Sequence, residues 1–585
     1  MKKFTLAAGL LIAALGLACT PLTPFYTQAS KTVWLDQGWS AAQRDTYHHI
    51  DQGTFTLLLP YEWFAALEQP SWGLTEAPPF ADQTWLDRFG FIPGKGALPV
   101  GFAHAPEFRD AAFNVWTNPG NGATLSGIGL TCAACHTGRL TYQGTEYLID
   151  GGSALTDVVA LNTALATAMH QTGWNPARFS RFAARVLGAN NSLANRLALR
   201  EQLVKILLQE DKVAALELLT MSGSPGEGFG RLDALNRIGN QVFALDMGNS
   251  SNYRARSAPV AYPHIWTAPW FTWVQYNGSI MQPMVRNAGE AMGVGARINL
   301  NASGPELYNS TIRFDHLQWI EKTLAGPRPP FPAKAFSGLN PPAWPATLPP
   351  IDRAKAAQGA ALYASMCQGC HLPPTHTQAF WRGPWWTKIE ATGETYLDLI
   401  QIPLAKIGTD PGQAAGMKAR TVQLSTHLNL GTNDFATALG AVVEKAADRW
   451  YAKQNPPLSP AARNEMNGAR PNTLQTPLEY KARPLNGIWA TPPFLHNGSI
   501  PTIHALLSPM SERATRFYLG DREYDPVNIG YRGNPIPGAS LLDTAKSGNH
   551  NTGHLFTNET NAAGKIGRGL TEAERMALIE YLKTL

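Results

Sequence analysis

Thiols are scarce in this chain of 585 residues, which contains only five cysteines. Cys19 lies near the N-terminus and the other four form two close pairs, so no thiol is left for a structural disulfide. Long apolar runs are also missing, because the stretch 4–18 is shorter than the roughly 18 residues that a membrane-spanning helix needs. Neither charge sign dominates, with 48 Lys and Arg against 43 Asp and Glu, so the composition does not indicate a nucleic-acid-binding protein.

The N-terminus has the pattern of an export signal. Lys2 and Lys3 precede the short apolar run, which is typical of a signal peptide over residues 1–19. Cys19 ends the sequence "LGLAC", which resembles a bacterial lipoprotein cleavage box. Two alternatives stay open: removal of the segment together with Cys19, or a lipid on Cys19 that anchors the chain. We expect a periplasmic or secreted protein whose only membrane contact would be through Cys19.

Proline divides the rest of the chain. Residues 326–350 contain nine prolines in 25 positions, which predicts an extended, semi-rigid linker. The linker separates an N-terminal domain over 30–325 from a C-terminal domain over 351–585. Because the chain has 53 glycines and 44 prolines, we expect a mainly α fold with long irregular loops.

Three segments have helical patterns. Residues 191–219 carry apolar side chains at helical spacing with charges between them, which predicts one or two amphipathic helices. Asp352 is a candidate N-cap for an Ala-rich helix that leads into the second cysteine pair. Thr571 and Glu574 form a capping box for a C-terminal helix that carries Tyr581. The pairing of the last two helices resembles the plan of a cytochrome c domain, and we expect two such domains.

Each cysteine pair is part of a CxxCH motif. Two thiols three residues apart on one turn can bind the two vinyl groups of a haem, and the adjacent histidine then lies beneath the iron. The motifs predict covalent c-type haems, one held by Cys132, Cys135 and His136 and the other by Cys367, Cys370 and His371. Thioredoxin-like redox chemistry and half of a zinc site are the alternatives, and neither requires the histidine or its repetition.

Histidines near the C-terminus are candidates for the remaining axial ligand. They are His496 and His504 in "FLHNGSIPTIHALL", and His550 and His554 in "SGNHNTGHLF". A short loop with glycine lets the backbone approach a haem ring closely, which suits a distal ligand.

Several segments together resemble one family of di-haem proteins. They are "GLTCAACHTGRLTYQGTEYLIDGG", "QYNGSIMQPMVRNAGEAMG", "FLHNGSIPTIHALL", "GDREYDPVNIGY" and "SGNHNTGHLF". In this order they resemble the bacterial rubber oxygenases and the di-haem oleate lipoxygenases, which are distantly related to di-haem cytochrome c peroxidases. The resemblance runs from about residue 127 to the C-terminus.

The resemblance implies different roles for the two haems. The first would keep an open distal side over an apolar pocket, and the second would be held by two histidines. The family's glycine-rich loop places the second distal ligand at His554, with His550 as the first alternative. His496 would lie near a propionate or between the haems, where it would tune the reduction potential.

An aromatic segment over residues 264–293 aligns with the family's pocket segment. Its candidate residues are Trp266, Trp270, Phe271, Trp273, Arg286, Asn287 and Glu290. As a set they would cover the first haem, with Trp273 near its edge or between the two irons. Core packing and an Arg–Glu ion pair are the alternative interpretation. Glu290 is decisive, because peroxidases use a distal carboxylate as an acid–base catalyst, whereas the oxygenases have a largely apolar pocket.

A further motif is "IGTDP" over residues 407–411, which is typical of a capped turn. Relatives among the peroxidases hold calcium between their haem domains, so calcium is a second interpretation that nothing else in the sequence supports.

The resemblance implies a haem dioxygenase that acts on double bonds of an apolar substrate. Its partners would be dioxygen and an unsaturated fatty acid, or polyisoprene as second choice. A di-haem peroxidase served by a small electron-transfer protein and a non-enzymatic di-haem electron carrier are the alternatives.

We predict two covalently bound haems per chain. A denatured, reduced sample should give the pyridine haemochrome spectrum of c-type haem, with two haems per polypeptide. A count of one would contradict the assignment of both motifs.

Overall fold

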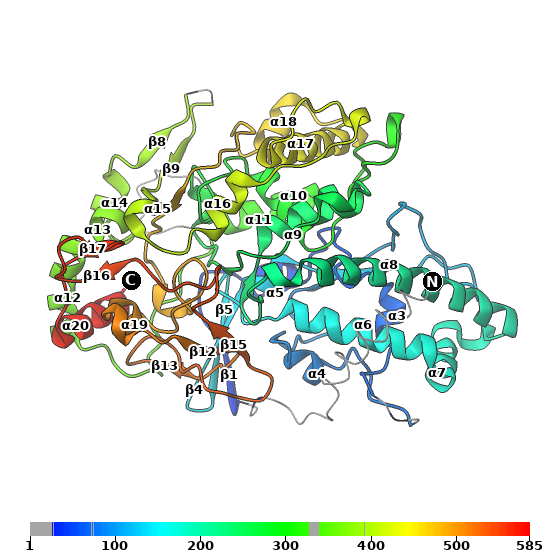
Figure 1. Cartoon of the computed structure of the whole chain (residues 1–585), viewed down its shortest axis with the longest axis horizontal. Coiled ribbons are helices and arrows are strands. Elements are labelled where there is room, and N and C mark those ends of the chain that lie inside the picture. Colours follow the sequence, from blue (N-terminus) through cyan, green and yellow to red (C-terminus); the bar gives the residue numbers. More distant parts are fainter. Residues whose placement is uncertain (1–25, 27–28, 72, 74, 327–337, 391) are drawn as a thin grey trace.

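The structure is a computed structural model that describes residues 26, 29–71, 73, 75–326, 338–390 and 392–585 (Figure 1). The expected signal segment 1–19 and Cys19 lie outside these residues. In Figure 1, α6, α7 and α8 extend to one side of the molecule, α10, α17 and α18 lie above, and α12 and α20 pack together at the opposite side.

Helices and short strand pairs are connected by long loops. The helices are α2 (Ala41–His49), α3 (Tyr61–Ala66), α4 (Gln83–Asp87), α5 (Cys132–Cys135), α6 (Val158–Trp174), α7 (Pro176–Leu187), α8 (Leu193–Thr220), α9 (Ala234–Gly239), α10 (Pro283–Gly293), α11 (Phe314–Ala325), α12 (Arg353–Met366), α13 (Gln368–His371), α14 (Gln378–Arg382), α15 (Leu404–Ile407), α16 (Gly412–Ala419), α17 (Phe435–Lys453), α18 (Pro460–Met466), α19 (Ile503–Leu507) and α20 (Glu572–Leu582). The strands are β1 (Lys31–Trp34), β2 (Phe102–Ala105), β3 (Gly127–Leu130), β4 (Thr137–Tyr142), β5 (Thr145–Asp150), β6 (Arg231–Leu232), β7 (Val260–Ala261), β8 (Trp386–Lys388), β9 (Thr395–Leu397), β10 (Gln401–Pro403), β11 (Glu479–Lys481), β12 (Arg516–Leu519), β13 (Tyr524–Asp525), β14 (Gly530–Tyr531), β15 (Ser540–Asp543), β16 (Leu555–Phe556) and β17 (Lys565–Gly567).

Strands on both sides of α5 hold the first CxxCH motif in place. The sheet has the order β1-β5-β4, in which β1 runs parallel and β4 antiparallel to β5. β3 pairs with β2 and ends directly before α5, while β4 begins directly after the motif histidine. The backbone on either side of the motif is therefore fixed by ladder hydrogen bonds.

Hydrophobic packing crosses the proline-rich segment. Met284 and Val285 of α10 belong to the same buried cluster as Val442 and Val443 of α17. A second cluster joins the sheet to α20, and a third fills the space among α3, α6, α7 and α8. The boundary at 326–350 stays a prediction, and the residues on its two sides share cores.

Both helices expected around the second motif are confirmed. Asp352 caps α12, and its side chain accepts hydrogen bonds from two main-chain N–H groups. Thr571 and Glu574 form the capping box of α20. The two helices cross at Gly359, where a Cβ atom would lie 2.0 Å from the Ala577 oxygen. Glycine therefore permits a backbone contact that no other residue allows.

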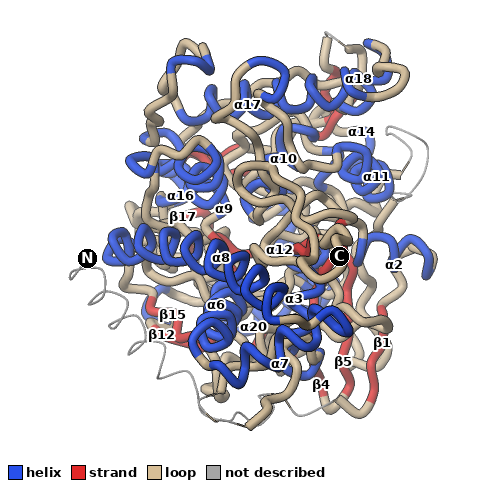
Figure 2. Tube along the Cα trace, turned by 90° about the vertical axis from the view of Figure 1, so that its right-hand side faces the viewer, coloured by secondary structure: helices blue, strands red, loops and turns tan. Residues whose placement is uncertain are grey.

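The helix predicted over 191–219 is confirmed as the single helix α8, capped by Ser192. Figure 2 shows it lying across α6. Its apolar side chains occur on both sides, since Leu199 and Leu203 are buried whereas Leu197 and Leu208 are exposed. Within the described ranges, no helix combines the length and the hydropathy needed to cross a membrane.

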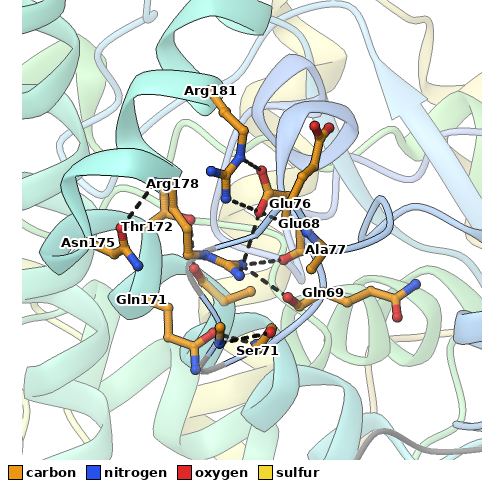
Figure 3. A network of polar contacts seen from close by, with 12 residues as sticks. Glu68, Gln69, Ser71, Glu76, Ala77, Gln171, Thr172, Asn175, Arg178 and Arg181 are labelled. Atoms are coloured by element: carbon orange, nitrogen blue, oxygen red, sulfur yellow. Dashed lines mark hydrogen bonds and ion pairs between the residues drawn. The ribbon is translucent and has the colours of Figure 1, made fainter.

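A buried ion-pair network attaches α6 and α7 to the segment after α3 (Figure 3). Glu68 is only 3% exposed and accepts two hydrogen bonds from Arg181, at 2.6 and 2.8 Å. Arg178 donates to the main-chain oxygens of Glu68 and Gln69, both at 3.0 Å. The buried carboxylate is thus paired, as burial of a charge requires.

We predict that Gly359→Ala destabilises the protein by about 1–3 kcal/mol, because the added methyl group overpacks the contact between α12 and α20. Gly416→Ala in α16 is the matched control, since nothing lies within 4 Å of its Cβ position. It should stabilise by about 0.5–1 kcal/mol. Denaturant unfolding followed by circular dichroism measures both, and equal effects would refute the close-contact argument.

Candidate functional site

The first motif is a single helical turn whose ends are tied down. The Thr131 side chain caps α5 by accepting from the Ala133 N–H. Tyr47 donates its hydroxyl hydrogen to the His136 carbonyl at 3.0 Å. On the outer side, Gly101 touches the backbone of Ala134, and its φ of +87° suits only glycine. The thiols of Cys132 and Cys135 consequently project from one fixed turn.

His136 is oriented by a main-chain carbonyl. Its Nδ1 lies 2.8 Å from the Pro263 oxygen, and because a carbonyl only accepts, Nδ1 carries the proton. Nε2 therefore keeps its lone pair and points away from the segment that contains Pro263. Burial lowers the pKa of His136 to about 4, so the ring is neutral at physiological pH. A neutral imidazole held in this way is suited to bind a metal.

A cavity of about 170 Å³ adjoins the first motif. This volume would hold several water molecules, and close-packed protein interiors do not normally leave so large a space. Besides Cys132, Cys135 and His136, its lining includes Ile238, Val260, Phe271, Val274, Gln275, Arg286, Asn287, Glu290 and Glu321. Most of the surface is apolar, and α10 and α11 contribute four of the polar side chains, Arg286, Asn287, Glu290 and Glu321.

The structure brings some of the predicted pocket residues to this cavity and not others. Asn287 and Glu290 line it, and so does Phe271. Trp270 is buried, Trp273 is partly buried, and neither lines the cavity. Their contact with a haem stays a prediction, whereas Phe271 and Tyr276 of this segment line the cavity.

Glu290 is a carboxyl group in an apolar environment. It accepts a hydrogen bond from the Gln275 Nε2 at 2.9 Å, and burial raises its pKa. Arg286 forms an ion pair with Glu321 instead, so the predicted Arg286–Glu290 pair does not form. A carboxyl group whose pKa is raised is better suited to proton transfer than a free one.

The second motif begins where α12 ends. Tyr363 of α12 donates to the Leu372 oxygen at 2.8 Å, which holds the turn after the motif. His371 Nδ1 lies 2.7 Å from the Arg483 main-chain oxygen. The same argument as for His136 applies, so the Nε2 of His371 is left free to bind a metal.

His554 and His371 both line a second cavity, of about 340 Å³. The two ring centroids are 6.3 Å apart. Two imidazoles that bind one metal ion from opposite sides should have centroids roughly 6 Å apart, because the metal–nitrogen bond is about 2 Å. The separation therefore fits one iron between the rings. Burial lowers the pKa of His554 to about 3, so this ring is also neutral.

Glycine contacts position the loop that carries His554. A Cβ atom on Gly553 would lie 2.2 Å from the Ile407 oxygen. The His554 N–H donates to the same oxygen at 2.9 Å. Arg513 holds the other side of the loop through the Gly553 and His554 carbonyls, at 2.8 and 3.1 Å. The glycine-rich sequence is thus needed for the close approach.

The other candidate histidines have different surroundings. His550 directs Nδ1 to the Thr544 oxygen at 3.0 Å and does not line the second cavity. His496 lines this cavity and stacks on Tyr480, with centroids 4.1 Å apart. His504 lies at the surface beside Glu572. The arrangement favours His554 over these three as a partner of His371.

Asp410 of the "IGTDP" turn is buried and bound to main-chain donors. Its carboxylate accepts from the N–H groups of Gly412, Gly548 and His550, at 2.8, 2.8 and 3.2 Å. Within the described residues, no group of three or more His, Cys, Asp or Glu side chains is arranged to hold a metal ion. The contacts of Asp410 are those of a loop anchor, and calcium stays an untested expectation.

The two cavities share a wall that the sequence did not indicate. Its residues, which we call the shared wall, are Ala261, Tyr262, Pro263, His264, Tyr276, Lys481 and Arg483. Among the described residues, Lys481 and Arg483 form no ion pair. Lys481 donates a hydrogen bond to the main-chain oxygen of Gln275, and Arg483 donates to the main-chain oxygen of His264. Burial, followed by the nearby Arg483 and Arg286, holds the pKa of Lys481 well below its usual value. A guanidinium and an amine so placed are suited to receive carboxylates, which would favour the charged form of Lys481.

These features fit c-type haem. Each cavity has two thiols on one edge, a neutral histidine below and cations in the shared wall for propionates. Burial raises the pKa of Cys132, Cys135 and Cys367 to about 12. A thioredoxin-like site needs the opposite shift, because its reactive cysteine is a thiolate, and no group of three or more His, Cys, Asp or Glu side chains among the residues that the structure describes is arranged to hold a metal ion. The donor set therefore favours haem over both alternatives.

Comparison with known proteins agrees with this assignment. Residues 479–518, which include Lys481, Arg483 and His496, match the family model described as RoxA-like, cytochrome c-like. The chain is 52% identical over 565 residues to the uncharacterised protein y4iJ of Sinorhizobium fredii (strain NBRC 101917 / NGR234), covering 96% of this chain and 94% of y4iJ. Protein y4iM of the same organism is 30% identical over 271 residues, covering 43% of this chain and 52% of y4iM. The domain match supports c-type haem and a haem-containing oxidoreductase.

We predict that His554→Ala converts one haem from low spin to high spin and leaves the other unchanged, because the second iron loses its distal imidazole. Absorption and electron paramagnetic resonance spectra of the ferric holoprotein measure this. His550→Ala is the matched control from the same loop and should leave both spectra unaltered. If His550→Ala produces the high-spin signal instead, the assignment of His554 is wrong.

Proposed function

Since the chain belongs to the same protein family as y4iJ and carries a RoxA-like, cytochrome c-like segment, we propose that it is a di-haem c-type oxidoreductase. One haem would be attached at Cys132 and Cys135 and the other at Cys367 and Cys370. Its reaction would be dioxygenation of a double bond in an apolar substrate. An unsaturated fatty acid, yielding a hydroperoxide, is the first choice and polyisoprene the second.

The observation that carries the proposal is the difference between the two cavities. His371 and His554 both line the second cavity, at a separation that suits one iron. The first cavity contains no such pair in the described part of the chain. Its other histidine, His264, follows Pro263 in the segment on the Nδ1 side of His136 and stacks on Trp266 with centroids 4.4 Å apart. This difference favours an enzyme over a carrier with two closed haems.

A haem bound at the first site supplies an iron that reacts with dioxygen or peroxide. The chain's own residues control what reaches it. His136 is fixed as the proximal imidazole, and Phe271, Val274 and Ile238 provide an apolar lining that excludes water and favours a hydrocarbon chain. The second site would support the first electronically.

Peroxidase activity is the second candidate, because Glu290 lines the first cavity. A buried carboxyl group whose pKa is raised, with Gln275 beside it, is the kind of group that can move a proton between the oxygens of a peroxide. The same residue has no required task in dioxygenation of an apolar substrate. Electrons for peroxide reduction would have to come from a small electron-transfer protein.

The deciding experiment compares the two reactions on the purified holoprotein. Oleate and latex are incubated under dioxygen without reductant or peroxide, and the products are identified by mass spectrometry. A hydroperoxide or cleaved isoprenoid supports the oxygenase. Absence of any oxygenated product, together with turnover of hydrogen peroxide by a reduced electron donor, supports the peroxidase.

We predict that Glu290→Gln leaves oxygenation within about threefold of the unaltered protein. In a peroxidase the same change should lower peroxide turnover by roughly 10²–10⁴-fold, because general acid–base catalysis is lost. Glu62→Gln is the control, since Glu62 binds Ser126 and lines neither cavity. A loss of oxygenation of more than a hundredfold in Glu290→Gln would contradict the expectation that Glu290 has no required task in dioxygenation.

A further inference from the structure

The two motif histidines are connected through the shared wall. His136 Nδ1 donates to the Pro263 oxygen at 2.8 Å. The next residue, His264, accepts at its main-chain oxygen from the Arg483 Nη2 at 2.6 Å. The main-chain oxygen of Arg483 in turn accepts from His371 Nδ1 at 2.7 Å. One residue thus holds the second histidine with its backbone and the supporting segment of the first with its side chain.

Arg483 is also a cation next to both cavities. Its guanidinium carbon lies 5.3 Å from the centroid of the Phe271 ring, and Nε has no hydrogen-bond partner among the described residues. No carboxylate of the described residues pairs with it, so only haem propionates would offset its charge, and removing Arg483 would leave those propionates unpaired beside both sites. Inside a protein, where the effective dielectric constant is low, such a charge acts more strongly than at the surface.

We propose that Arg483 is a positioning residue that couples the two haem sites and raises both reduction potentials. The inference rests on the proposed function in that it requires a haem at each motif. Reduction of a ferric haem adds one electron and removes one positive charge from the site, so a neighbouring cation favours the reduced form. The hydrogen-bond path additionally links the orientation of one proximal imidazole to that of the other.

The test measures the midpoint potential of each haem by spectroelectrochemical titration of the holoprotein. Arg483→Gln should lower the reduction equilibrium constant of both haems at least tenfold, which is 59 mV for a one-electron couple. Arg483→Lys replaces the planar fork by an amine, and at a pH where that amine is protonated both reduction equilibrium constants should stay within about threefold of the unaltered protein.

Arg181→Gln is the control. This substitution also removes a guanidinium from a buried partner, Glu68, but Arg181 lines neither cavity. Both midpoint potentials should therefore stay unchanged. Unaltered potentials in Arg483→Gln, or a shift of one haem alone, would overturn the proposal. A haem count by pyridine haemochrome accompanies each sample. Fewer than two haems in the unaltered protein would contradict the proposed function, whereas two haems with unchanged potentials in Arg483→Gln would contradict the coupling alone.

A measurement on the unaltered protein applies even if Arg483→Gln does not fold. Imidazole added to the ferric protein binds at an open first iron, and the midpoint potential of the second haem is then determined. Coupling is reciprocal, so ligation at the first site should shift the second potential. A second potential that does not respond to saturating imidazole contradicts the coupling.

Discussion

The candidate site depends on one kind of interaction, the hydrogen bond from the Nδ1 of each motif histidine to a main-chain carbonyl. The Pro263 oxygen receives it from His136, and the Arg483 oxygen receives it from His371. Each bond selects the tautomer and fixes the plane of the imidazole, which leaves Nε2 as the ligand atom. Because both carbonyls belong to the shared wall, the two sites are built on the same short stretches of backbone.

The difference between the sites comes from the C-terminal loop. Gly553 lets this loop lie against the Ile407 backbone, and His554 then reaches the second cavity, which His371 also lines. The first cavity is lined instead by Glu290 of α10 and by Phe271. The two similar motifs therefore have different surroundings. The second has a further histidine near it, and the first has an apolar cavity suited to a substrate.

Local signals in the sequence predicted the parts of the site that depend on neighbouring residues. The CxxCH spacing, the caps at Asp352 and Thr571 and the glycine beside His554 each determine geometry within a few positions, and the structure has them as expected. The positions of the aromatic side chains were harder to predict, because adjacency in the sequence does not determine which side chain lines a cavity. Phe271 lines the first cavity, whereas Trp270 and Trp273 do not.

Arg483 was not predictable, because its partners His264 and His371 lie 219 and 112 positions away in the chain. No periodicity or motif marks such a contact. The same holds for the cores that span residues 326–350, since only the folded chain shows which apolar residues meet.

The central claim is that one haem site is closed by two histidines while the other keeps an iron position available. Titration of the reduced holoprotein with carbon monoxide tests this most directly. One carbon monoxide should bind per chain that carries two haems, and the spectrum of the second haem should not change. Binding of no carbon monoxide would mean that both irons are closed, and binding of two would mean that His554 does not hold the second iron. Either result would contradict the assignment of one closed and one open haem site.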